Sequence, residues 1–251
     1  MGDKTAISWT RYTWNPWRGC EKLSPGCAHC YMFTAQEKRQ RETGNIELWD
    51  PSIVRRTTTW RDPDRWQREA AALGRTERVF TCSWSDFFIP AADAWRAEAW
   101  EIIHRTPNLI YQILTKRPEN IPDRLPPDWG EGYPNVWLGV SLENPRYLWR
   151  VDALRKIPAM IHFISAEPLL ASLPGLELTG SDWLIVGGES GRTFRPMPHE
   201  WARELLAKAR AAGTAFFFKQ SAAIRTEMGT KLHGEVLNEY PESNYAPAQI
   251  R

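Results

Sequence analysis

The sequence lacks any apolar run of the roughly 18 to 20 residues that a membrane-spanning helix needs. It also lacks a secretory signal, because Met1-Gly2-Asp3-Lys4 leads into a mixed polar stretch rather than an apolar one. Both absences predict a cytoplasmic protein with no membrane partner. Thiols stay reduced in that compartment, so clustered cysteines there bind metals or do redox work more often than they form disulfides.

An excess of charge of either sign is missing too. The chain has 32 lysines and arginines against 30 aspartates and glutamates, and its formal net charge of +2 is too small to indicate a nucleic-acid partner by itself. Tryptophan, by contrast, is abundant, with 14 residues, and several stand beside arginine, as in Trp60-Arg61 and Trp149-Arg150. Indoles among guanidinium groups can stack on bases, but we favour tryptophans that pack a core with arginines lying over it.

A pattern of short apolar runs predicts an α/β fold. Each run is followed by small and charged residues and then by a helical or loop stretch, and the runs start roughly 20 to 30 residues apart, as in strand–helix units. Continuous rather than alternating apolarity is typical of parallel strands that are covered on both faces. The runs are residues 79–82, 109–114, 136–140, 160–164, 183–186 and 215–218, and residues 7–14 supply an earlier strand.

Helical stretches are expected between several of these strands, at residues 93–105, 147–156 and 198–212. No linker or low-complexity tract divides the chain, and its length suits one barrel of the TIM type. We therefore predict one α/β domain, a partial or complete TIM-type barrel over residues 1–220. Residues 221–251 are expected to form an irregular C-terminal extension packed on the barrel.

Polar and charged side chains follow most of the predicted strands. In an α/β barrel the carboxyl ends of the strands meet at one face, where ligands bind. We therefore expect a polar ring at the mouth of the barrel, although serine and aspartate also follow strands simply as helix N-caps. The residues at these ends include Ser85, Asp86, Thr115, Lys116, Ser141, Glu143, Glu167, Gly187, Gly188, Glu189 and Lys219.

Three of the four cysteines stand in one loop, residues 15–31. Cys20 and Cys27 are separated by six residues, and Cys27 and Cys30 by two. A structural zinc site usually takes four protein ligands, and the fourth could come from His29, from Cys82 or from elsewhere. An iron–sulfur cluster also commonly takes four cysteines, and with three of them one iron keeps an open position for a substrate or cofactor. Both kinds of metal site stay open at this point.

The cysteine loop after a first strand resembles the radical S-adenosylmethionine superfamily. The usual spacing there is three residues and then two, where this chain has six and then two. The segment VSLENP, residues 140–145, is similar to a motif at the end of the superfamily's fourth strand, and residues 136–140 are the fourth strand predicted here. Gly187-Gly188-Glu189 spells the superfamily's cofactor-binding motif, but it follows the sixth predicted strand rather than the second. Ser85 or Asp86 stands at the second-strand position.

Eight segments along the chain resemble, in order, a phage-associated family of unknown function with the same three-cysteine motif. They are SWTRYTWNPWRGC, SPGCAHCY, SDFF, LTKRPE, VWLGVSLEN, FISAEPLL, WLIVGGESG and FFFKQ. This resemblance implies a phage or prophage origin and a barrel like that of radical S-adenosylmethionine (radical SAM) proteins. Members often lack a cysteine where Cys82 stands, which makes Cys82 a weak candidate for an essential ligand.

These resemblances imply a radical SAM enzyme with a 4Fe-4S cluster on Cys20, Cys27 and Cys30 and S-adenosyl-L-methionine at the open iron. Reductive cleavage would give a 5′-deoxyadenosyl radical, with electrons from a flavodoxin- or ferredoxin-like donor. The substrate could be a nucleic acid base or modified nucleotide in DNA repair or modification, and the reaction could be that of a lyase, isomerase or transferase. Glu189 and Lys219 are expected to be catalytic. The residues expected to bind the cofactor are Ser85, Asp86, Thr115, Lys116, Ser141, Glu143, Glu167, Gly187 and Gly188.

Two other functions are open. One is a zinc- or iron–sulfur-binding protein that binds nucleic acid through its arginines and tryptophans, without radical chemistry. The other is an iron–sulfur enzyme that uses its cluster as a Lewis acid. Whatever the function, Lys219 ends an apolar strand and needs a partner there, and Glu189 or Glu167 could provide one.

Overall fold

The predicted apolar runs form one parallel sheet. A computed structural model describes residues 5–243 and 245–247, and its main sheet has seven strands in the order β1-β4-β5-β6-β7-β8-β9. Every neighbouring pair is parallel. The predicted strand at residues 7–14 is formed only by its last three residues. The strands are β1 (Tyr12–Trp14), β4 (Glu77–Thr81), β5 (Leu109–Thr115), β6 (Val136–Ser141), β7 (Ile161–Ala166), β8 (Trp183–Gly187) and β9 (Ala215–Gln220).

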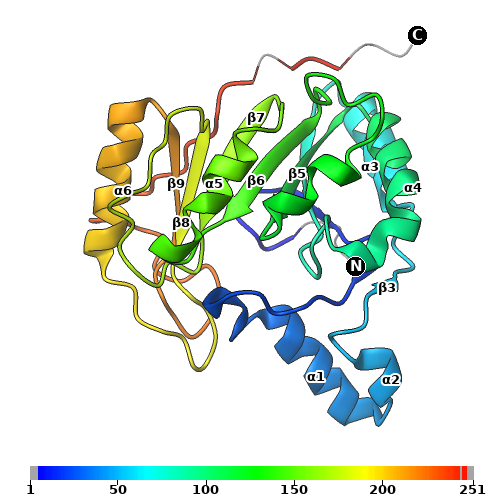
Figure 1. Cartoon of the computed structure of the whole chain (residues 1–251), viewed down its shortest axis with the longest axis horizontal. Helices are drawn as coiled ribbons and strands as arrows, with labels where there is room; N and C mark the ends of the chain where they lie inside the picture. The colour runs from blue at the N-terminus through cyan, green and yellow to red at the C-terminus, as the bar shows by residue number, and fades with distance from the viewer. Residues whose placement is uncertain (1–4, 244, 248–251) are drawn as a thin grey trace.

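The sheet curls into half of a barrel (Figure 1). β1 and β9 stand at the two ends of the strand order and do not pair with each other within the described part of the chain, so the barrel is partial. Helices α3, α4, α5 and α6 line the outer side of the sheet, and α1 and α2 stand together apart from them (Figure 1). The helices are α1 (Tyr31–Thr43), α2 (Ile46–Trp49), α3 (Asp62–Ala72), α4 (Asp93–His104), α5 (Trp149–Leu154) and α6 (His199–Ala212). The predicted α/β partial barrel is confirmed at this level.

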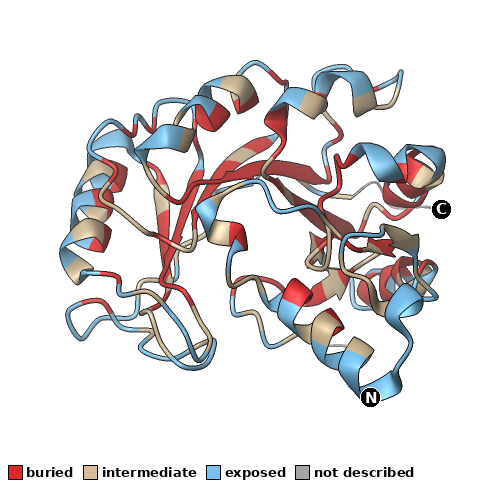
Figure 2. Cartoon of the chain, turned by 60° about the horizontal axis from the view of Figure 1, so that its bottom comes forward, coloured by how far each residue is buried: buried red, intermediate tan, exposed pale blue. Residues whose placement is uncertain are grey.

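Alternate residues of the strands face two different hydrophobic clusters. Leu184 and Val186 of β8 belong to the larger cluster, which also holds Leu205 of the outer helix α6. Trp183 and Ile185 of the same strand belong to a smaller cluster on the opposite, inner face. Both faces of the sheet are therefore covered, which explains the continuous apolar runs and the buried strands in Figure 2. The inner cluster consists of Trp9, Ile110, Trp137, Ile161, Phe163, Trp183, Ile185 and Phe217.

The helices α4 and α6 correspond to the predicted ones, and the stretch 147–156 holds α5 after the 3₁₀ turn η5 (Pro145–Tyr147). Sequence reasoning did not predict α1, α2, α3 or the antiparallel pair of β2 (Trp17–Arg18) with β3 (Arg55–Arg56). α1 begins directly after Cys30 and ends at Thr43, and the C-cap residue Gly44 has a φ of 67°, in the left-handed region that glycine adopts easily. The position of Cys30, the last of the clustered cysteines, is thus fixed by the start of α1.

The C-terminal extension runs along the edge strand β9. Phe217 and Asn238 form an antiparallel bridge, and the hydroxyl of Tyr245 donates to the carbonyl of Pro107 at 2.8 Å. The described part of the extension therefore packs on the sheet, whereas residues 1–4 of the predicted barrel and 244 and 248–251 of the predicted extension lie outside the described residues. Over residues 5–243 and 245–247, no helix has the length and apolarity that crossing a membrane requires.

Candidate functional site

A cavity of about 640 Å³ lies at the carboxyl ends of the strands. This volume is within the range of about 300 to 1,000 Å³ that ligand pockets usually have. Cys20, Cys27, Cys30 and Cys82 all line the cavity. Most of the predicted strand-end residues line it too, namely Ser85, Asp86, Thr115, Lys116, Ser141, Glu167, Gly188, Glu189 and Lys219. The fold therefore brings the cysteine loop and the polar strand ends together.

Three local structures position the clustered cysteines. Cys20 follows β2, and its N–H donates to the carbonyl of Pro51 at 2.8 Å. Cys27 is the last residue of the 3₁₀ turn η1 (Pro25–Cys27), and Cys30 immediately precedes α1. All four cysteines are free thiols. The loop therefore presents three reduced sulfur atoms to one cavity.

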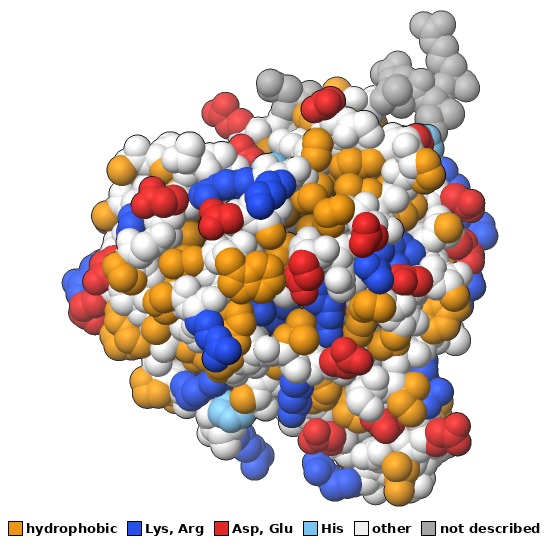
Figure 3. Space-filling view, in the orientation of Figure 1, with side chains coloured by type: hydrophobic (Ala, Val, Ile, Leu, Met, Phe, Trp, Pro, Cys, Tyr) orange, Lys and Arg blue, Asp and Glu red, His pale blue; other side chains and the backbone are white. Residues whose placement is uncertain are grey.

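The surroundings of the three thiols differ. Desolvation raises the pKa of Cys20 to about 12, and the Asp86 charge adds to this effect. Desolvation likewise raises the pKa of Cys30. Desolvation also acts to raise the pKa of Cys27, but the charge of Lys116 and hydrogen bonds from Ser24 outweigh it, so that this pKa is lowered. Basic side chains are visible in a recess near the centre of the face shown in Figure 3.

The donor set can be compared with the metals that the sequence suggested. Thiolates are the ligands of structural zinc and of iron–sulfur clusters, so three free thiols on one cavity fit either kind of centre. As the side chains lie, the histidines, cysteines, aspartates and glutamates of residues 5–243 and 245–247 form no group of three that could hold a metal ion. The chemistry of the donors thus fits both centres, and both predictions stay open.

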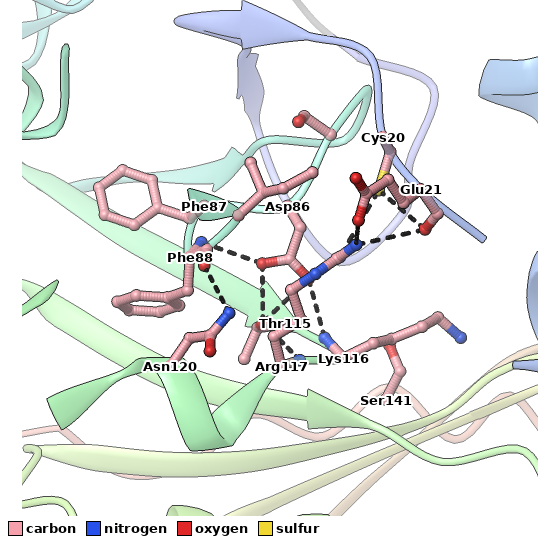
Figure 4. A network of polar contacts seen from close by, with 12 residues as sticks. Cys20, Glu21, Asp86, Phe87, Phe88, Thr115, Lys116, Arg117, Asn120 and Ser141 are labelled. Carbon is pink, nitrogen blue, oxygen red and sulfur yellow. Dashed lines mark hydrogen bonds and ion pairs between the residues drawn. The ribbon is translucent and has the colours of Figure 1, made fainter. Parts of the chain in front are cut away.

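Asp86 and Arg117 connect two strand ends with the cysteine loop (Figure 4). The carboxylate of Asp86 accepts from the hydroxyl of Thr115 at 2.7 and 2.9 Å and from the N–H of Lys116 at 3.0 Å. Arg117 donates to the same carboxylate at 3.3 Å and to the Cys20 sulfur at 3.7 Å. Asp86 and Arg117 are both buried. Asp86, which was predicted to bind the cofactor, therefore uses its carboxylate to hold the end of β5, and Arg117 connects it to the Cys20 thiol.

Glu143 lies beneath the cysteine loop and does not line the cavity. It is fully buried, and its carboxylate pairs with Lys116 and with Arg150, the latter at 3.1 Å. The hydroxyl of Ser24 donates to it as well. A Cβ at Gly26 would lie 2.5 Å from the Glu143 side chain, so the loop passes over this carboxylate in contact with it. Glu143, predicted to bind the cofactor, thus contacts the loop that carries Cys27.

Glu189 contacts the cysteine loop from the sixth strand of the sheet. Its carboxylate lies 3.0 Å from Nδ1 of His29 and accepts from the N–H and the side chain of Arg195. Arg195 also donates to the carbonyl of Pro25 at 3.0 Å. Desolvation acts to raise the pKa of Glu189, but the hydrogen bonds from Arg195 and His29 lower it to about 2. The carboxylate is thus ionised and holds the cysteine loop at His29 directly and at Pro25 through Arg195.

Lys219 takes one of the two partners that the sequence offered. Its Nζ lies 2.5 Å from Oε1 of Glu167, and both residues line the cavity. Glu189 is bound by Arg195 instead. Gly188 permits a close approach of the chain, because a Cβ there would lie 2.2 Å from the backbone nitrogen of Ala222. Gly187 is not among the lining residues. The fold thus places the ion pair of Lys219 with Glu167 at the cavity wall.

Sequence reasoning missed three residues that hold the site together: Ser24, Arg150 and Arg195. Arg150 is next to Trp149 in the sequence and was grouped with the arginine–tryptophan pairs, but its side chain is only 2% exposed and binds Glu143. Arg195 lies in a loop without a motif. Ser24 has a usable signal, since it stands three residues before Cys27, at the N-cap position of the turn that carries this cysteine.

Comparison with known proteins gives one match. The family described as "Protein of unknown function (DUF5131)" matches residues 4–244, nearly the whole chain. No curated protein and no solved structure matches the chain. The family description names no reaction and no source, so radical SAM chemistry and a phage origin stay predictions. With the match over almost its full length, the chain belongs to the DUF5131 family.

Proposed function

We propose that this protein is a radical SAM-type iron–sulfur enzyme. The observation that carries the proposal is that the three clustered cysteines line the same cavity as the polar strand ends. A structural zinc site would explain the cysteines but would give no role to the cavity of about 640 Å³ that they line. The half-barrel, which opens at this cavity, is compatible with a radical SAM-like fold.

Cys20, Cys27 and Cys30 would hold a 4Fe-4S cluster. When bound, this cluster would supply one electron to S-adenosyl-L-methionine, which would then be cleaved into methionine and a 5′-deoxyadenosyl radical. The chain's own residues would bind S-adenosyl-L-methionine and orient it. Lys116 and Lys219 place cations at the cavity wall, where each already pairs with a carboxylate, and can bind a carboxylate of a ligand. Ser141 and Ser165 end neighbouring strands at the cavity and can donate to ribose hydroxyls.

The proposal includes two partners and leaves the reaction class open. An external one-electron donor of the flavodoxin or ferredoxin kind is needed, because no residue of the chain can supply the electron. The substrate is proposed to be a nucleic acid base or modified nucleotide. Glu167 and Lys219 are the residues of the cavity wall that we assign to its reacting group, while Glu189 is assigned to the cysteine loop because Arg195 and His29 bind its carboxylate.

Metal and product analysis test the proposal. After anaerobic reconstitution with iron and sulfide, we expect a brown protein with about four irons and four sulfides per chain. Incubation with dithionite and S-adenosyl-L-methionine is then expected to yield 5′-deoxyadenosine and methionine in equal amounts. A colourless protein with one zinc would support the zinc-binding alternative instead. A full cluster without any 5′-deoxyadenosine would contradict radical chemistry and leave the Lewis-acid alternative.

A further inference from the structure

Three arginines and two tryptophans gather beside the cavity, on the side of α1 and α2. Arg18 lies over the ring of Trp49, with 4.2 Å between its Cζ and the ring centroid. Arg39 of α1 lies between two indoles, with its Cζ 4.8 Å from the centroid of Trp49 and 5.5 Å from that of Trp84. Arg55 of β3 is paired with Arg18 in the β2–β3 ladder and completes the group, which we call the arginine–tryptophan surface.

The positive charges of this surface lack carboxylate partners. Arg18 donates to the carbonyl of Leu48 at 3.2 Å, and Arg55 to that of Glu47 at 2.6 Å. For Arg18, Arg39 and Arg55, no ion pair with a carboxylate occurs within the described ranges, 5–243 and 245–247. Like charges held together without compensation cost free energy, so their retention favours an anionic ligand.

Two exposed arginines near or outside this surface show how a carboxylate can neutralise a guanidinium group in this chain. Arg56 pairs with Glu98 although it follows Arg55 directly, and Arg203 on α6 pairs with Glu200. The carboxylate nearest in sequence to the arginine–tryptophan surface, that of Asp50, accepts from the N–H and hydroxyl of Ser52 at 2.9 and 2.7 Å. Its pKa is lowered chiefly by these hydrogen bonds and in part by the charge of Arg55, so Asp50 compensates Arg55 in part. Neutralising Arg18 and Arg39 is left to a ligand.

The arginine–tryptophan surface is continuous with the mouth of the cavity. Trp84 belongs to both, because it lines the cavity and contacts Arg39. Tyr31 also lines the cavity, and the residue is 52% exposed. The N–H of Gly19 donates to the carbonyl of Trp84 at 3.1 Å, which ties the loop of Trp84 to the segment of Arg18. A long ligand that binds to this surface can therefore extend into the cavity.

We propose that the arginine–tryptophan surface binds single-stranded nucleic acid and leads one of its bases into the cavity. Guanidinium groups bind phosphates through planar, paired hydrogen bonds, and indoles stack on bases of any sequence. Arg18 and Arg39 already lie over Trp49, so Trp84 at the mouth of the cavity is the indole on which we expect a base to stack. A duplex fits less well, because its base faces are stacked on each other and unavailable to an indole. The inference rests on the proposed function in one respect, that the base is the substrate.

Fluorescence anisotropy of a labelled mixed-sequence strand of about 12 nucleotides tests the inference on the full-length protein. We expect Arg39→Gln to weaken binding about fivefold and to reduce the slope of log affinity against log salt by about 0.7. Trp84→Ala is expected to weaken binding about tenfold with the salt slope unchanged, because stacking involves no ion release. Arg203→Gln, a charge-matched change on α6, is expected to bind as the parent does.

Equal affinities of the Arg39→Gln and Arg203→Gln proteins would overturn the inference. So would binding of a poly-glutamate peptide as tight as that of the strand, together with an unaffected Trp84→Ala protein, since an acidic protein would then be the better partner. Tighter binding of the duplex than of the single strand would overturn the choice of ligand. Arg39→Lys, which keeps the charge, distinguishes loss of charge from loss of structure. Binding can fail while 5′-deoxyadenosine still forms, so this test and that of the proposed function are separable.

Discussion

Arg117 joins the Cys20 thiol to the buried carboxylate of Asp86. Its Nη1 lies 3.7 Å from the sulfur and 3.3 Å from Oδ2 of Asp86, and its side chain is only 5% exposed. The guanidinium thus places a fixed positive charge and an N–H donor beside a proposed cluster ligand. Donors and positive charge at a ligating sulfur favour the reduced, more negative form of an iron–sulfur cluster.

We therefore expect Arg117→Gln to lower the reduction potential of the reconstituted cluster, measured by potentiometric titration followed by electron paramagnetic resonance. Arg117→Lys, which keeps the charge, should lie between this variant and the parent. Removing the charge also leaves Asp86 buried without its ionic partner. The free energy of unfolding, measured with urea, should therefore fall by about 3 kcal/mol. An unchanged potential in a fully loaded Arg117→Gln protein would show that the contact does not tune the cluster.

The cysteines give a second prediction. Replacing Cys20, Cys27 or Cys30 by alanine should abolish retention of iron, measured after reconstitution and desalting, because a cluster on three cysteines has no spare ligand. Cys82→Ala should retain most of the iron. Cys82 stands outside the cysteine loop, directly after β4, although it lines the same cavity.

The Cys82 variant is the informative control of this series. If it loses iron as completely as the other three variants do, four cysteines hold the cluster. The open iron that the proposed function requires would then be absent. Circular dichroism of all four proteins checks that loss of iron is not loss of fold.

Gly26 gives a third prediction, about the loop itself. A Cβ at this position would meet the Glu143 side chain at 2.5 Å, and Glu143 cannot move aside because Lys116 and Arg150 hold it. Gly26→Ala should therefore displace the turn that carries Cys27 and reduce iron retention severalfold, with an overpacking cost of about 1 to 3 kcal/mol. Gly175→Ala is a matched control, since its Cβ would approach only Leu148, at 3.3 Å. Equal iron contents in both variants would contradict the idea that this contact shapes the loop.

The pKa of Glu189 gives a fourth prediction. Desolvation opposes its ionisation, but hydrogen bonds from Arg195 and His29 lower its pKa from 4.5 to about 2. A carboxylate whose pKa is lower in the folded state contributes stability above its unfolded pKa, and this stability is lost as the pH falls from about 4.5 toward 2. Glu189→Gln should therefore be less stable than the parent by about 2 kcal/mol at pH 7, and the difference should shrink toward pH 3.

Urea unfolding of both proteins between pH 7 and pH 3 measures this effect. Glu200→Gln is the control, because Glu200 is exposed on α6 and is expected to change stability by less than about 0.5 kcal/mol. A difference between the Glu189→Gln protein and the parent that is the same at both ends of the pH range would mean that shape, not charge, explains the loss.

The sheet could be predicted from the sequence because both of its faces are covered. Runs such as residues 183–186 are then apolar at every position, and their spacing marks a strand–helix order. α1 was missed because its buried residues, Met32, Phe33 and Gln36, occupy only its first half, so that no apolar stripe extends over the helix.

The cavity could be predicted in outline, but its pairings could not. Strand ends meet at one face by topology alone, which is why Lys219 and the cysteines were expected to lie together. Whether Lys219 pairs with Glu167 or Glu189 depends on loop conformation, and the loop after β8 supplies Arg195 to Glu189.

The arginines and tryptophans also show that burial and contacts cannot be predicted from sequence neighbours. Trp149 and Arg150 are neighbours in sequence, yet 45% of Trp149 is exposed while Arg150 is buried against Glu143. Trp60 is buried as well, as the core interpretation predicted. The arginine–tryptophan surface instead combines residues from five separate places in the chain, including Arg18 and Trp84. No local sequence pattern contains such a group.

The half-barrel has two edge strands, and both are poor templates for strand addition by another molecule. β1 has only three residues, too few to support a stable intermolecular ladder. At the other end, the N–H of Phe218 donates to the carbonyl of Leu237, and that of Glu239 donates to the carbonyl of Phe216, so the extension occupies the outer edge of β9. An open half-barrel sheet is in this way protected against aggregation through its own edges.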